Sequence, residues 1–170
     1  VPVVLECVQK PHPPLWYGVS KAEATPWAAR NGLNIVCNGP SAQVRPITDT
    51  YRREWNDASG NGQNSMPLMG LGRHLMVAET SKEAFDIGRR AFGVWYQSLQ
   101  HLWKLHGHSM THYPIPEDFT AAEKAGIVIV GTPDEVTEKL KGEIEISGVN
   151  YILTRFAYGD LSFDESVYSL

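Results

Sequence analysis

Cysteine is scarce in this chain of 170 residues, which contains only Cys7 and Cys37. Two cysteines make neither the disulfide framework of a small secreted domain nor the paired spacing of a zinc site. We therefore expect both to be reduced thiols in a fold that depends on its hydrophobic core. A hydrophobic content of 42% is sufficient for such a core, and the length corresponds to one domain over residues 1–170.

The chain also lacks an excess of basic residues and any long apolar run. Its formal net charge is −4 and its pI is near 5.8, so no basic stripe is available to displace counterions from a nucleic acid. The apolar runs are far shorter than the roughly 20 residues of a membrane-spanning helix. Residues 1–10 lack the charged head and apolar middle of a signal peptide. We expect a soluble cytoplasmic protein that binds neither nucleic acid nor membrane.

The two ends of the chain lack the usual start and stop signals. The sequence begins at Val1 rather than at a methionine. It stops at Leu170, shortly after Ser162 opens a helix, and no glycine closes that helix. We expect the sequence to be a fragment of a longer protein.

One pattern occurs four times in this sequence: an apolar run leads into a Ser or Thr, and a Glu follows three residues later. In such a capping box the hydroxyl accepts a hydrogen bond from the amide three residues on. The Glu carboxylate accepts one from the amide of the Ser or Thr, so the pattern marks a helix start. The runs are 14–19, 69–78, 127–130 and 151–156, and the boxes begin at Ser20, Thr80, Thr132 and Ser162.

Two further segments complete an alternation of strand and helix. Residues 34–37 form an apolar run without a box, and a fifth box runs from Thr120 to Glu123. Strands that are joined through helices are parallel, so the expected fold class is α/β, with parallel strands and helical crossovers. Folds of this kind place their chemistry in the turns directly after the strands.

Apolar spacing and helix caps predict where the elements begin and end. The third strand contains Gly70 and Gly72, which indicate a bend or bulge. The longest helix should bury one continuous stripe from Phe85 to His106. The expected strands are 15–19, 34–37, 68–78, 127–130 and 151–156. The expected helices are 20–31, 80–106, 132–148 and one that starts at Ser162. A further helix, between the second and third strands, has Val44, Ile47, Tyr51 and Trp55 on one face.

The turn Gly18-Val19-Ser20 is the first candidate site. The glycine allows a tight turn, and the free amides at a helix start attract an anion such as phosphate. Lys21 and Thr25 would add a positive charge and a hydroxyl. From these residues alone, however, the interpretation of Ser20 and its Glu as a simple cap is favoured.

The same turn approximates the G-x-S-x-G motif, in which Ser20 would be the nucleophile of a serine hydrolase. Ala22 stands where that motif has glycine, and no histidine follows His112, so the chain order Ser, acid, His is missing. Hydrolysis is therefore the weaker alternative.

Three other groups of residues are candidates for chemistry. The histidines include a His-x-His pair, but no Glu-x-x-His or cysteine accompanies it, so we expect a lid and a helix end rather than a metal site. Arg155 and Asp160 either form an ion pair that braces a loop or face a ligand. The groups are His101, His106, His108 and His112; Asn38-Gly39-Pro40; and the segment from Arg155 to Asp160.

Five segments, in this order and spacing, resemble the C-terminal half of the bacterial luciferase-like flavin-dependent monooxygenases. The resemblance implies a (β/α)₈ TIM barrel, of which this chain would supply the fifth to eighth βα units. It also implies an excursion before the last strand, which corresponds to residues 107–126. The segments are 9–16, 27–33, 73–78, 131–136 and, together, 148–151 with 155–161.

The resemblance further implies a cofactor and a reaction. Reduced FMN, or a deazaflavin in some relatives, would bind at the carboxyl ends of the strands, and O₂ would be used to oxygenate an aldehyde or another small organic substrate. The phosphate contacts of the family lie in the turn after the fifth strand of the barrel, which corresponds to the turn after the first strand of this chain. The resemblance therefore favours the anion site over the simple cap. Bacterial luciferase has a Glu-Ser pair where this chain has Ser20-Lys21. The expected cofactor contacts are Gly18, Val19, Ser20, Lys21, Thr25 and Asn38.

The catalytic histidine of the family and much of its isoalloxazine pocket belong to the first half of the barrel, so no catalytic residue is assigned here. We expect a monooxygenase fragment that is inactive alone, the alternative being a flavin-binding protein without catalysis. Four parallel strands would leave edges near Leu15 and Tyr151. A homodimer or the missing N-terminal half-barrel would cover them, or residues 1–13 would fold over the open side.

Overall fold

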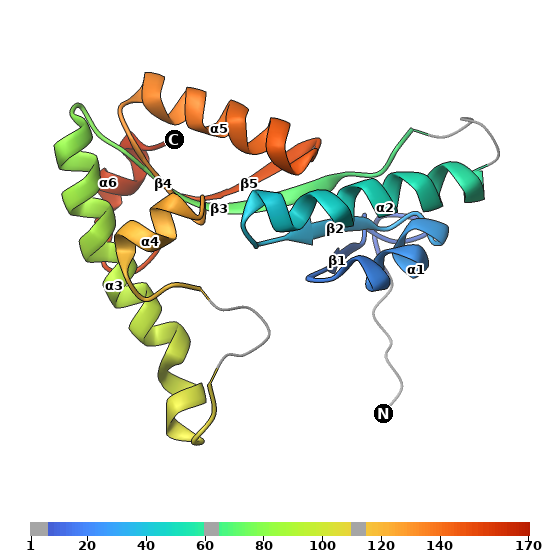
Figure 1. The fold of residues 1–170 in the computed structure, drawn as a ribbon, viewed down its shortest axis with the longest axis horizontal. Helices are drawn as coiled ribbons and strands as arrows, with labels where there is room; N and C mark the ends of the chain where they lie inside the picture. Colours follow the sequence, from blue (N-terminus) through green and yellow to red (C-terminus); the bar gives the residue numbers. More distant parts are fainter. Residues whose placement is uncertain (1–6, 60–64, 110–114) are drawn as a thin grey trace.

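The computed structural model describes residues 7–59, 65–109 and 115–170 (Figure 1). Within these residues, strands alternate with helices as the sequence predicts. The strands are β1 (Trp16–Gly18), β2 (Asn34–Cys37), β3 (Met69–Val77), β4 (Val128–Gly131) and β5 (Tyr151–Arg155). The helices are the 3₁₀ turn η1 (Ala22–Ala24), α1 (Thr25–Arg30), α2 (Ser41–Ser59), α3 (Ser81–Leu105), α4 (Phe119–Lys124), α5 (Pro133–Ser147) and α6 (Phe163–Tyr168).

β3 is the centre of a parallel sheet. Both β2 and β5 pair with Gly70 and Leu71, so they lie on opposite edges of β3. His74 pairs with both β5 and β4, so β4 lies on the same edge as β2, farther along the strand. β1 pairs with the outer side of β2. The order β1-β2-β3-β5 is therefore an arc of sequential parallel strands, as in half of a (β/α)₈ barrel, and the expected fold class is confirmed.

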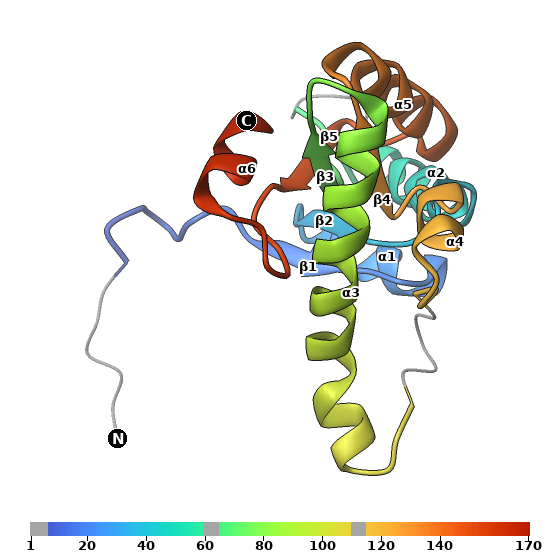
Figure 2. The same cartoon turned by 90° about the vertical axis from the view of Figure 1, so that its left-hand side faces the viewer.

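Helices pack on both faces of β3 because its side chains alternate between the faces. Leu75 and Val77 pack against Val136 of α5, which lies along the sheet in Figure 1. On the other face, Met76 packs with Phe92 of α3. Figure 2, in which the left-hand side of Figure 1 faces the viewer, shows α3 in front of the sheet.

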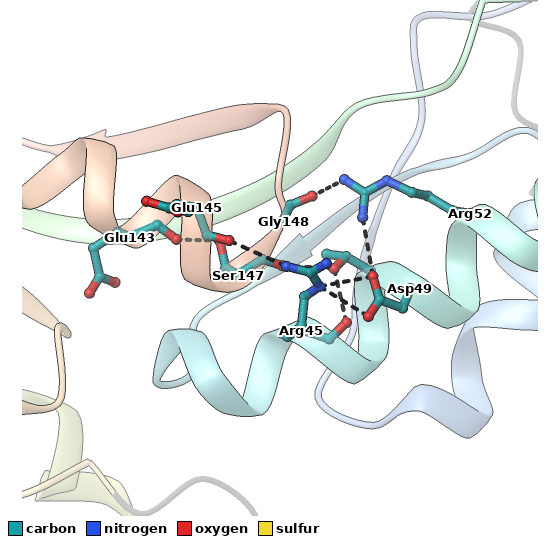
Figure 3. A network of polar contacts seen from close by, with 8 residues as sticks. Arg45, Asp49, Arg52, Glu143, Glu145, Ser147 and Gly148 are labelled. Carbon is teal, nitrogen blue, oxygen red and sulfur yellow. Dashed lines mark hydrogen bonds and ion pairs between the residues drawn. The ribbon is translucent and has the colours of Figure 1, made fainter.

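Polar contacts between α2 and the end of α5 fix the segment that leads into β5 (Figure 3). Arg45 donates to the carbonyl of Glu145 at 3.3 Å, and Arg52 donates to the carbonyl of Gly148. Asp49 lies within ion-pair distance of both guanidinium groups. α5 ends at Gly148 in the left-handed conformation, with φ of 68°, so its last carbonyls are free to accept these bonds.

Helix caps confirm several of the predicted boxes. Thr132 and Ser162 form complete boxes, and Thr80 accepts a first-turn amide at the start of α3. The box predicted at Thr120 is wrong, because Asp118 caps α4 and its carboxylate accepts a backbone amide at 2.8 Å. Asp is a stronger N-cap than Thr, so α4 begins earlier than predicted.

The single helix predicted over residues 20–31 is wrong. The chain first forms η1, with Lys21 at its N-cap and no side-chain cap bond, and α1 begins only at Thr25. Pro26 explains the break, because proline has no amide hydrogen for the carbonyl of Ala22 and its ring clashes with that carbonyl in a continuous helix. The hydroxyl of Thr25 donates to this carbonyl instead, at 2.6 Å.

The bend predicted at Gly70 and Gly72 is also wrong, since β3 keeps a regular register through both residues. The glycines instead allow side chains from the neighbouring strands to meet over β3. A Cβ atom at Gly70 would overlap Leu153, and one at Gly72 would overlap Asn38.

The predicted stripe of α3 is buried only in the first part of the helix. Phe92 is fully buried, but Leu102 is 64% exposed and His106 is also exposed. The C-terminal turns of α3 extend away from the sheet in Figures 1 and 2, which is why they bury little. Among the helices of the described residues, none combines the length and apolar character needed to cross a membrane.

Candidate functional site

Strand register places several candidate residues on one face of the arc. Gly18 pairs with Val36, which pairs with Gly70, and Gly70 pairs with Tyr151. Trp16 of β1 and Tyr151 of β5 meet on this face, with ring centroids 5.5 Å apart, although β2 and β3 lie between their strands. The arc is therefore strongly curved. Its concave side, which we call the inner face, includes Trp16, Val36, Asn38, Gly70, Gly72, His74, Tyr151, Leu153 and Arg155.

An open pocket of about 170 Å³ lies at the carboxyl ends of β1 and β2. A Cβ atom on Gly18 would meet no heavy atom within 4 Å, so the missing side chain leaves this space open. The pocket is far larger than the roughly 10–15 Å³ that one water molecule requires. Its lining is Gly18, Val19, Ser20, Val36 and Asn38. The structure thus brings together four of the residues predicted to contact a cofactor.

Two of the predicted contacts, Lys21 and Thr25, do not line this pocket. Thr25 is fully buried, and its hydroxyl already donates to the carbonyl of Ala22. Lys21 is exposed at the N-cap of η1. The sequence feature that could have indicated this arrangement is Pro26, which prevents the continuous helix on which the prediction depended.

A positive charge contacts the pocket lining from β5. Arg155 Nη2 donates to Asn38 Oδ1 at 2.6 Å, and the two side chains meet over Gly72. The ion pair considered between Arg155 and Asp160 is not formed, because Asp160 lies 3.5 Å from Arg90. Within the described ranges, no carboxylate lies within ion-pair distance of Arg155. Burial and the nearby Arg73 lower the pKa of Arg155, but a guanidinium remains charged at neutral pH.

His74 lies on the inner face, beside Arg155 in the strand register. It is 2% exposed, and its ring lies 4.2 Å from Trp95 and 4.8 Å from Tyr158, between centroids. Neither nitrogen of His74 nor the hydroxyl of Tyr158 has a hydrogen-bond partner among the described residues. Burial, together with Arg155, lowers the pKa of His74 to about 4, so the imidazole is neutral at pH 7. Sequence reasoning missed this residue, although its even spacing from Gly70 and Gly72 indicates the inner face.

A buried ion pair on the opposite face supports the loop after β2. Arg73 is fully buried and donates to Glu143 of α5 at 2.7 Å. The same nitrogen donates to the carbonyl of Gly39 and the hydroxyl of Ser41, both at 2.9 Å. This network therefore fixes the residues that follow Asn38. The signal in the sequence is an arginine within an apolar strand, since such a residue is buried only when it is paired.

The other candidates do not form sites in the part of the chain that the structure describes. Ser20 is exposed, and no described histidine forms a hydrogen bond with it, so the hydrolase alternative has no base there. His101, His106 and His108 are exposed at the end of α3, and His112 lies outside the described residues. No group of three metal-ligating side chains occurs among the residues that were placed.

Comparison with known proteins identifies the family. The model of the luciferase-like monooxygenases matches residues 3–151. The uncharacterized protein y4wF of Sinorhizobium fredii (strain NBRC 101917 / NGR234) is 35% identical over 173 residues, which cover 99% of this chain and 49% of that protein. The chain thus spans about half the length of this curated relative.

Solved structures show the same fold. Monooxygenase RslO1 from Streptomyces bottropensis superimposes with a TM-score of 0.70 at 23% identity, covering 95% of this chain and 46% of RslO1. The oxygenating constituent of 3,6-diketocamphane monooxygenase from Pseudomonas putida, a type II Baeyer–Villiger monooxygenase in complex with FMN, has a TM-score of 0.60 at 18% identity. It is covered over 41% of its length, and this chain over 84%. The chain therefore belongs to the luciferase-like monooxygenase family.

Proposed function

We propose that this chain contributes the flavin-phosphate site of a luciferase-like, flavin-dependent monooxygenase. The observation that carries the proposal is the pocket at Gly18, Val19, Ser20 and Asn38, which lies at the carboxyl ends of parallel strands. Barrel enzymes bind their ligands at this end of the strands. Membership of the family supports a flavin as the ligand, and reduced FMN is the form that we propose.

The residues of the pocket have distinct roles in this proposal. Gly18 leaves room for the phosphate, because it lines the pocket and the space at its Cβ position holds no heavy atom within 4 Å. The amide of Val19 is already bound to the carbonyl of Val36 at 2.9 Å, so Ser20 and Asn38 supply the donors. Asn38 uses Oδ1 to accept from Arg155, which leaves its amide nitrogen Nδ2 to donate to the phosphate.

The reduced flavin supplies the redox chemistry when bound, delivering one oxygen atom of O₂ to an aldehyde or another small organic substrate. The residues of this chain bind and orient the cofactor. Because the chain spans about half of its relatives, we propose that the groups that act on the substrate belong to the other half of the barrel. The isolated chain should then bind flavin without oxygenase activity.

Two measurements test this function. Fluorescence titration of the chain with FMN should show saturable binding that inorganic phosphate competes away. A deazaflavin phosphate, titrated in parallel, decides between the two cofactor classes by its relative affinity. Reduced FMN, O₂ and a long-chain aldehyde should then give no oxidised product above the buffer control; product formation would show that the chain is catalytically complete.

The second candidate function is a flavin-binding protein without catalysis, which the pocket of phosphate-binding groups would also serve. Combining the chain with a separately produced N-terminal half of a relative distinguishes the two. Restored aldehyde oxidation supports the monooxygenase. Flavin binding without any restored aldehyde oxidation favours the flavin-binding protein without catalysis.

A further inference from the structure

Arg155 is a cation on the inner face without a neutralising partner in the described ranges. The other guanidinium near this part of the sheet, Arg73, is compensated by Glu143 on the opposite face. The neighbour of Arg155 in the register, His74, is buried and uncharged at neutral pH. The charge of Arg155 is thus available to an anion on the inner face.

The contact between Arg155 and Asn38 connects this charge to the pocket. Asn38 is the lining residue to which Arg155 donates, at 2.6 Å. The bond requires Gly72, because a Cβ atom there would overlap Asn38 Oδ1 and lie 3.0 Å from Arg155 Nη2. The position of this guanidinium therefore depends on β5, on Gly72 of β3 and on Asn38, which follows β2.

We propose that Arg155 is the cation that binds the anionic group in the pocket, and that Asn38 is its positioning residue. This inference rests on the proposed function, in which the anionic group is the phosphate of FMN. Neither Arg155 nor Lys21, which the sequence favoured as the cation, lines the pocket itself. We assign the role to Arg155 because its guanidinium donates to the lining residue Asn38.

The central experiment compares charge-neutralising variants of the chain by titration with FMN, riboflavin and inorganic phosphate. Arg155→Gln should weaken the binding of FMN and phosphate by about tenfold or more, as expected for a hydrogen bond to a charged group. Riboflavin has no phosphate, so its affinity should not change. Arg30→Gln is the matched control, because Arg30 is an exposed arginine at the end of α1 and outside the pocket lining.

The positioning role of Asn38 is tested by comparing phosphate binding in two variants of this residue. Asn38→Asp keeps an oxygen that accepts from Arg155, but the new carboxylate neutralises the charge of Arg155 and repels an anion. Asn38→Asp should therefore weaken phosphate binding more than Asn38→Ala does. Gly72→Ala changes no charge but displaces Asn38 from Arg155, and it should weaken FMN binding while leaving riboflavin binding unchanged. If Asn38→Asp binds phosphate as well as Asn38→Ala does, Asn38 does not position a phosphate-binding cation.

The outcomes separate this inference from the proposed function. If Gly18→Val weakens FMN binding but Arg155→Gln behaves like Arg30→Gln, the pocket is correct and the role of Arg155 is wrong. A larger loss in Lys21→Gln than in Arg155→Gln would assign the cation to Lys21. Equal losses for FMN and riboflavin in Arg155→Gln would indicate a purely structural role. If neither Gly18→Val nor Arg155→Gln changes FMN binding, both the inference and the proposed function are wrong.

Discussion

Arg155 at the end of β5 and Asn38 directly after β2 are joined by a hydrogen bond of 2.6 Å, although β3 lies between their strands. The bond spans β3 at Gly72, where the absence of a side chain lets the two residues meet. It links the end of β5 to the loop after β2, and barrel enzymes place their ligands at this end of the strands.

Gly18→Val should weaken FMN binding more than Ser20→Ala does. The valine side chain would fill the pocket, whereas loss of the Ser20 hydroxyl removes only one of several donors. Because a Cβ atom at Gly18 meets no heavy atom within 4 Å, the melting temperature should change little. Gly93→Ala is the control, since Gly93 also has open space around its Cβ position but lies on α3. Equal FMN affinity in Gly18→Val and the unmodified chain would exclude this pocket as the binding site.

Glu143→Ala should destabilise the fold by about 3–5 kcal/mol, because it leaves the guanidinium of Arg73 buried without its counter-charge. The double variant Arg73→Leu, Glu143→Leu should lose less, since it buries no charge. Glu138→Ala, which removes an exposed ion pair with Lys141 on the same helix, should have little effect. Urea unfolding measures all three. A loss in Glu143→Ala no larger than in Glu138→Ala would contradict the structural role of the pair.

Stability should fall as the pH decreases from about 6.5 to about 4, in part because of His74. Burial and Arg155 lower the pKa of His74 to about 4 in the folded chain, so the unfolded chain binds the proton more readily over this interval. The loss amounts to as much as about 3 kcal/mol below pH 4 and is absent above pH 6.5. His74→Phe should show a flatter dependence in urea unfolding at several pH values. A His74→Phe profile parallel to that of the unmodified chain would show that His74 does not contribute.

The edges of the sheet should promote self-association when no other half-barrel is present. β1 and β5 are the ends of the arc, and Tyr151 on β5 is 43% exposed. An unpaired edge with an apolar face associates readily. Light scattering at micromolar concentration should therefore give about twice the 18.9 kDa of one chain. Tyr151→Lys should shift the mass toward that of one chain, and a monomeric mass for the unmodified protein would contradict the dimer.

The alternative to a dimer is that residues 1–13 fold over the open side of the sheet, and the structure describes only part of this segment. Residues 7–13 are exposed, and Val8 is 99% exposed, so this part does not cover the inner face. Residues 1–6 lie outside the described residues. A chain without residues 1–13 should keep its dimeric mass, whereas loss of the dimer on this deletion would implicate the segment in the interface.

The sequence was sufficient to predict the strands and the parallel fold, because these depend on local patterns. Apolar runs and capping boxes such as the one at Thr132 are readable within a few residues. Gly18 at the end of a strand was likewise a local signal. The capping box predicted at Ser20 is wrong for a reason that is also local: Lys21 is the N-cap of η1, and Pro26 prevents a continuous helix from Ser20.

The contacts that give the site its charge were not predictable in the same way. Arg155 and Asn38 are 117 positions apart in the sequence, and their contact depends on the register of β5 on β3 and of β3 on β2. The partner of Arg73 likewise comes from a distant helix. A sequence pattern shows that an arginine within a strand requires a partner, but only the packed structure identifies it.

The most direct test of the central claim compares the affinities of FMN and riboflavin for the chain by calorimetry. The two ligands differ only in the phosphate, so the ratio of their dissociation constants isolates the contribution of the pocket at Gly18, Ser20 and Asn38. We predict that FMN binds at least about tenfold more tightly, corresponding to about 1.4 kcal/mol or more, and that inorganic phosphate removes this advantage. Equal affinities for FMN and riboflavin would contradict the assignment of the pocket as a phosphate site.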